Sequence, residues 1–201
     1  MKLKTVLQLL KAKRRIILYE SDDGQWIGDG SAAFPLHGLP SMKPENLRSL
    51  LDVTEKQFAQ INVSSENAPF STDDNVIDEM MLKYCGMTIN YLGHELIPLI
   101  SETKIYYIQS GYIKPFGGTD DISYDVRKLE NGSEYIAVKE GFLLRAIIMP
   151  YDVVKDDFIS VLRRIYSLSM AAMSAGKEQA RQKIERSEFG NMTFEEAENY
   201  E

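Results

Sequence analysis

The stretch from Thr5 to Leu47 decides the fold, and it reads TVLQLLKAKRRIILYESDDGQWIGDGSAAFPLHGLPSMKPENL. Its apolar residues first recur at helical spacing, which predicts an amphipathic helix over residues 4–13. An apolar run at 16–19 then predicts a strand, and the Asp-Asp-Gly sequence at 22–24 predicts a tight turn. We expect the return strand to run from 26 to 36, with a bend at its glycines. This order of elements indicates an α+β protein.

The remainder of the chain is predicted to be rich in strands. Pro44 starts a short helix, because proline is favoured in the first turn, and Thr54 with Gln57 forms a capping box for a second helix. A further short helix is an option for residues 93–100, and the Asn-Gly pair at 131–132 predicts a hairpin. The predicted strands are 80–91, 104–109, 111–116, 122–129, 134–139 and 142–149.

Composition divides the chain into three parts. Residues 1–154 are predicted to form a single α+β domain of antiparallel, strand-rich sheets backed by helices. Within it, the polar and turn-rich segment 62–76 is the best candidate for a mobile loop. Residues 155–187 are expected to form a C-terminal helix, and residues 188–201 an acidic tail. The residues that we place on one face of that helix are Phe158, Leu162, Ile165 and Met173.

The overall charge limits the classes of partner. The net charge of −7 argues against indiscriminate binding to nucleic acid or to an anionic membrane. The charge is uneven, however, because residues 1–20 hold six Lys and Arg against one Glu. A single cysteine, Cys85, excludes an internal disulfide and fits a reducing compartment. No stretch approaches the ~20 apolar residues of a membrane span, so we expect a cytoplasmic protein with no membrane partner.

The sequence contains no catalytic constellation, and we predict that the chain is not an enzyme and holds no metal or cofactor. Residues 28–33 match the dinucleotide fingerprint G-x-G-x-x-A. Phosphate binding needs a helix to start directly afterwards, and the Phe-Pro sequence at 34–35 favours a bent strand instead. His37, His94 and Cys85 lack the spacing of a metal site.

Two clusters of basic residues are the strongest candidates for binding. The first lies on or beside the predicted helix 4–13. It could contact nucleic-acid phosphates or simply form a solvated face of the helix, and the sequence favours neither interpretation over the other. Its members are Lys11, Lys13, Arg14 and Arg15. In the second cluster, interleaved acids favour a solvated face. Its members are Arg163, Arg164, Lys177, Arg181 and Lys183. For the strand aromatics, sheet packing is favoured over base stacking; they are Tyr106, Tyr107, Tyr112, Phe116 and Tyr124.

Two segments resemble a known family. The first begins with a helix, a strand, a turn and a second strand, and it continues with IGDGSAAFPLHGLPSMKPENL at Ile27–Leu47. It resembles the closing half of a domain of the bacterial sliding clamp, the DNA polymerase III beta subunit. The segment EYIAVKEGFLLRAIIMPYDVV at Glu134–Val154 resembles the strand, acidic-Gly turn and strand of the same family. The resemblance implies strand-rich layers backed by helices that face DNA inside a ring. It would place Lys11, Lys13, Arg14 and Arg15 on or beside the helix that faces duplex DNA.

Two functions therefore stay open. The first is a non-enzymatic, sliding-clamp-like protein that associates with or tethers to double-stranded DNA, encoded by a phage or a mobile element, and that forms homo-oligomers. The alternative is a protein–protein interaction or assembly module with no nucleic-acid role, which docks a protein partner through its sheet and its C-terminal helix. Truncation after Val154 should abolish docking only in the second case.

Overall fold

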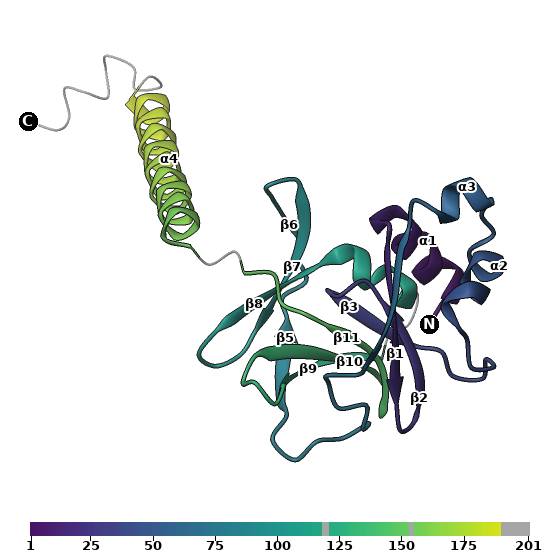
Figure 1. Cartoon of the computed structure of the whole chain (residues 1–201). Helices are drawn as coiled ribbons and strands as arrows, with labels where there is room; N and C mark the ends of the chain where they lie inside the picture. The colour runs from purple at the N-terminus through teal and green to yellow at the C-terminus, as the bar shows by residue number, and fades with distance from the viewer. Residues whose placement is uncertain (118–120, 153–154, 190–201) are drawn as a thin grey trace, which may run out of the picture. The chain divides into compact units, whose positions relative to one another are not determined.

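The computed structural model describes residues 1–117, 121–152 and 155–189, with side chains of the last helix described as far as residue 179. The chain forms two compact units, Met1–Asp152 and Val153–Glu201. Figure 1 shows a strand-rich unit and the long helix α4. The fold is α+β with a large, mostly antiparallel sheet and a C-terminal helix, in agreement with the sequence-based prediction.

The N-terminal elements follow the predicted order with one correction. They are α1 (Leu3–Lys13), β1 (Arg15–Ser21), β2 (Gly24–Gly28) and β3 (Ala32–Pro35). We expected one bent strand from 26 to 36, but β2 and β3 pair antiparallel with each other, so the chain reverses between them. The reversal is held by Asp29, whose carboxylate accepts hydrogen bonds from the backbone amides of Ser31 at 2.9 Å and Ala32 at 3.0 Å.

Short helices then lead to the parallel strand of the sheet. They are η1 (Pro44–Asn46), α2 (Leu47–Leu51) and α3 (Glu55–Phe58), and they precede β4 (Asn62–Asn67). The capping box is confirmed, because the Gln57 amide donates to the Thr54 hydroxyl and the Thr54 amide donates to the Gln57 side chain. The loop predicted for residues 62–76 is wrong for its first six residues, which form β4 beside β1. Their polarity suits a strand with one unpaired edge.

The second half of the strand-rich unit contains the remaining strands. They are β5 (Met80–Tyr84), β6 (Ile89–Tyr91), β7 (His94–Ile100), β8 (Ile105–Gln109), β9 (Ile122–Lys128), β10 (Glu134–Glu140) and β11 (Leu143–Ile148). The predicted strand 80–91 is broken at Gly86, which has a positive φ of 70°. The hairpin at 131–132 is confirmed by the antiparallel pairing of β9 and β10.

Two further predictions are wrong. Residues 94–100 form β7 instead of a helix, and Pro98 is tolerated because it lies between the segments of β7 that pair with β6 and with β5. Residues 111–116 were expected to form a strand, but this region forms the short 3-10 helices η2 (Ser110–Tyr112) and η3 (Lys114–Phe116). Pro115 has no amide hydrogen to give to a neighbouring strand.

The described strands join in the order β4-β1-β2-β3-β11-β10-β9-β5-β7-β6, with β8 paired to β7. Both faces of the sheet bury apolar side chains, which explains the unbroken apolar run in β1. On one face Val6 and Leu10 of α1 pack into the larger core cluster. On the other, Phe70 makes edge contacts with Trp26 at 5.5 Å and Tyr19 at 5.3 Å between ring centroids. The aromatic residues predicted to pack in the sheet are all buried. Tyr106, Tyr107 and Tyr124 lie in strands as expected, whereas Tyr112 and Phe116 lie in η2 and η3.

Candidate functional site

The first basic cluster lies where α1 ends and β1 begins. Arg14 closes the helix in the left-handed conformation, with a φ of 55°, and its amide donates to the carbonyl of Lys11. Lys11 and Lys13 lie in the last turn of α1, where cations interact favourably with the helix dipole. Arg15 is the first residue of β1. The helix end therefore gathers all four predicted cations at one corner of the strand-rich unit.

The four side chains are exposed, and they meet different neighbours. The Lys13 ammonium donates to the Gln109 side chain at 3.3 Å and lies 5.9 Å from the centre of the Tyr112 ring. The Arg15 guanidinium lies beside Gly30, 3.4 Å from where a Cβ would sit on that residue. Among residues 1–117, 121–152 and 155–179, no acidic side chain forms an ion pair with any of the four cations. Their charge remains available to an anionic partner.

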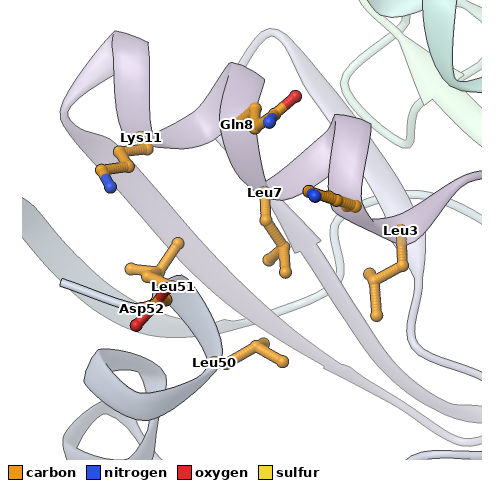
Figure 2. Close-up of a pocket in the computed structure, with 8 residues that line it drawn as sticks. Leu3, Leu7, Gln8, Lys11, Leu50, Leu51 and Asp52 are labelled. Carbon is orange, nitrogen blue, oxygen red and sulfur yellow. The ribbon is translucent and has the colours of Figure 1, made fainter.

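A hollow of about 460 Å³ lies between α1 and α2, next to Lys11. Figure 2 shows Leu3 and Leu7 of α1 pointing toward the Leu50 and Leu51 side of the hollow. Lys11 lies on the side of Leu51 and Asp52, so the hollow has an apolar floor and a mixed polar rim. It contains no group of side chains arranged for nucleophilic or acid–base chemistry.

The loop at residues 28–33 does not form a phosphate site. A Cβ on Gly28 would lie 2.0 Å from the carbonyl oxygen of Ala32, so glycine is needed for the close chain reversal. Asp29 is buried, and its second carboxylate oxygen accepts a hydrogen bond of 2.7 Å from the Tyr112 hydroxyl. Burial, with the nearby Asp29 carboxylate, raises the pKa of Tyr112. A strand follows this loop, and so the helix N-terminus that phosphate binding requires is missing here.

A buried charge cluster joins the segment before β5 to the sheet. Glu79 accepts hydrogen bonds from Arg127 at 3.0 Å and 2.8 Å and from Lys139. Lys139 also lies 3.5 Å from the Asp125 carboxylate, and Arg127 donates to the backbone carbonyls of Asp73 and Asp74. Burial alone would raise the pKa of Glu79, but the hydrogen bonds from Lys139 and Arg127 outweigh it and lower that pKa. The charges neutralise one another, so the cluster acts as a structural clamp.

The three candidate metal ligands lie in separate surroundings. His37 makes an edge contact with Trp26, His94 lies against Tyr151, and the Cys85 thiol donates to the carbonyl of Pro98. Within the described residues, no group of His, Cys, Asp and Glu side chains is arranged to hold a metal ion.

Helix α4 (Asp156–Phe189) carries an exposed apolar face. Val161, Leu162, Ile165 and Leu168 are between 45% and 62% exposed, although each would suit a protein core. Tyr166, Met170 and Met173 extend this face. The opposite side is polar and includes Arg163 and Arg164. It also includes Ser160, Ser167 and Ser174, whose hydroxyls donate to carbonyls within the helix. Arg181, Lys183 and the tail from residue 190 lie outside the described side chains.

Comparison with known proteins gave no match. No protein-family model fits the chain, and neither curated proteins nor solved structures are significantly similar to it. None of the described helices is long and apolar enough to cross a membrane.

The structure brings the four N-terminal cations to one corner and separates the other candidates. Our sequence analysis placed Phe158, Leu162, Ile165 and Met173 on one face of α4, but the structure buries Phe158. It did not name the further exposed apolar residues of the helix, which are Val161, Tyr166, Leu168 and Met170. The spacing of four and three residues from Val161 to Ile165 to Leu168 was a signal that could have found two of them. The Glu79 cluster carried no sequence signal, because its members come from three distant segments.

Proposed function

We propose that this chain is a non-enzymatic docking protein that binds a protein partner through the apolar face of α4. The exposed apolar face carries the proposal. Large aliphatic side chains exposed along several turns of one helix favour a surface that another polypeptide covers. The strand-rich unit would be a separate folded unit of the same chain.

Photo-crosslinking from the helix face tests this proposal. A photoreactive residue at Leu168 should form crosslinks to other polypeptide chains in cells that express the protein. The same residue at Ser167, on the polar side of the same turn, should form far fewer, and it is the matched control. If neither position crosslinks to another chain, the docking function is wrong.

We also propose a second function, a clamp-like tether to double-stranded DNA, because one observation favours it. Lys11, Lys13, Arg14 and Arg15 are exposed at one corner and have no acidic ion-pair partner among the described residues. Contacts between such cations and phosphates give affinity without sequence preference. This function would operate alongside docking, since the two surfaces consist of different residues.

Charge reversal tests the DNA proposal. Replacing Lys11, Lys13, Arg14 and Arg15 by Glu should weaken binding to duplex DNA in fluorescence anisotropy. It should also flatten the slope of log K against log salt by about 0.9 for each phosphate that the variant no longer neutralises. The matched control reverses the same number of exposed charges elsewhere, at Lys43, Lys56, Lys83 and Lys128. Equally weakened binding in both variants would show that only net charge matters and would overturn the assigned surface.

A further inference from the structure

The apolar face of α4 contains a seam with regular spacing. Val161, Ile165, Leu168, Ala172 and Ala175 follow one another at intervals of four and three residues, the spacing that keeps side chains on one line between two paired helices. All five are exposed. The seam spans about 21 Å of helix between Val161 and Ala175, enough for several layers of contact.

Side-chain size changes along the seam. Its N-terminal half carries the large residues Ile165 and Leu168, and its C-terminal half carries the small residues Ala172 and Ala175. A second copy of the helix that runs antiparallel would place Leu168 against the partner's Ala172 and Ile165 against the partner's Ala175. Each central layer would then contain one large and one small side chain, which is the complementarity that close packing requires.

The residues beside the seam agree with the same alignment. It brings Arg164 next to the partner's Glu178 and, by symmetry, Glu178 next to the partner's Arg164, so that opposite charges flank the seam on both ends. On the other flank it brings Leu162 next to the partner's Gly176. The large and small residues of the central layers require this alignment by themselves, and the flanking residues are independent of them.

A parallel pair would lack these features. In register, it would stack Ala172 on the partner's Ala172 and Ala175 on the partner's Ala175, which leaves the C-terminal half loosely packed. Arg164 would face the partner's Ser169 across the flank, and its charge would have no opposite.

We therefore propose that α4 pairs antiparallel with α4 of a second copy of this chain. The proposal rests on the docking function above, and it names the partner of the same surface. Tyr166, Met170 and Met173 are exposed and lie outside the two-helix seam.

Light scattering of the purified full chain tests the self-pairing. At high concentration the mass should be at least twice the chain mass of 22.9 kDa, and it should fall on dilution. Leu168→Glu should raise the dissociation constant about 100-fold or more, because the charge would be buried against an apolar layer. Ser167→Glu is the matched control on the polar side and should leave the mass unchanged.

Disulfide trapping tests the direction of the helices. In a Cys85→Ser background, Arg164→Cys chains mixed with Glu178→Cys chains should form a mixed disulfide under mild oxidation, whereas neither variant alone should form a dimer. Ala175→Cys alone should stay unlinked in the antiparallel pair and should crosslink readily in a parallel one. Mass spectrometry of the linked peptides identifies each product.

The outcomes separate this inference from the docking function. A monomer at every concentration, or efficient linkage of Ala175→Cys with itself, would overturn the antiparallel self-pairing. If that monomer still crosslinks to other proteins from position 168, the docking function stands and its partner is a different chain. If position 168 crosslinks only within its own molecule, both proposals are wrong, because the chain itself covers the face.

Discussion

Single residues govern the chain reversal between β2 and β3. Gly28 leaves room for the Ala32 carbonyl, and Asp29 holds the two amides that follow it. The Tyr112 hydroxyl satisfies the remaining oxygen of the buried Asp29 carboxylate from a distant helical turn. A buried carboxylate is tolerated here because three donors surround it. Gly28 and Asp29 belong to the segment that matches the nucleotide fingerprint, but the geometry of the chain reversal is what requires them.

Gly28→Ala should lower the free energy of unfolding by about 2–3 kcal/mol, because a Cβ would meet a backbone oxygen that cannot rotate away. Chemical denaturation at neutral pH measures the decrease. Gly111→Ala is the control, since its new methyl group would meet only the Leu9 side chain at 3.7 Å and should cost less than about 1 kcal/mol. Equal decreases in both variants would contradict the assigned role of Gly28.

At the scale of elements, charge pairs attach the segment before β5 to the sheet. Arg127 of β9 and Lys139 of β10 both reach Glu79, and the side chain of Arg127 is only 1% exposed. The Asp74 carboxylate also accepts a hydrogen bond of 2.7 Å from the amide of Leu144 in β11. Removal of the Glu79 carboxylate would leave the buried Arg127 and Lys139 with fewer partners. The free energy lost in this way is larger than the net stabilisation that the ion pairs provide, because buried cations would remain without full compensation.

Glu79→Gln should therefore destabilise the chain by about 3 kcal/mol at pH 7. The folded pKa of Glu79 is lowered, so its stabilisation is present above the ordinary pKa of about 4.3 and disappears as the pH falls through the folded value. The difference between wild type and variant should shrink over that acid range in urea denaturation.

The control for Glu79 is Glu134→Gln. The hydrogen bond from Lys104 lowers the pKa of Glu134 too, but the Lys104 side chain is 56% exposed. Such a surface pair should contribute less than about 1 kcal/mol at pH 7. A larger destabilisation in Glu134→Gln than in Glu79→Gln would contradict the role of burial.

At the scale of the whole molecule, the two core clusters belong to one unit. All of their buried members lie between Val6 and Ile148, on the two faces of the same sheet. The described part of helix α4 contributes no residue to either cluster. Stability and docking are thus assigned to different parts of the chain.

A chain that ends at Asp152 should accordingly fold on its own and keep a cooperative thermal transition within about 5 °C of the full chain. Near-ultraviolet circular dichroism of the buried Trp26 reports the transition. Phe34→Ala in the full chain, which empties a fully buried site, should lower the midpoint by much more. A truncated chain without a cooperative transition would contradict this division.

Sequence reasoning located most elements where local chemistry decides them. The helix over residues 4–13, the capping box at Thr54 and the hairpin at 131–132 depend on neighbours within a few residues. The sequence-based prediction was wrong where a segment pairs with a strand that is distant in the sequence. Asn62–Asn67 looks like a loop until β1 offers an edge, and His94–Ile100 becomes a strand because β8 and its other neighbours pair with it.

The sequence by itself determined the α+β class, the C-terminal helix and the concentration of positive charge at residues 11–15, since these follow from periodicity and composition. Tertiary structure alone decided the strand order, the pairing of Glu79 with the buried Arg127 and Lys139, and the exposure of the basic corner without acidic partners among the described residues. The physical reason is the range of the interactions. Helical periodicity and turn chemistry act over a few residues, whereas strand pairing and the neutralisation of buried charge join segments that only the folded chain brings together.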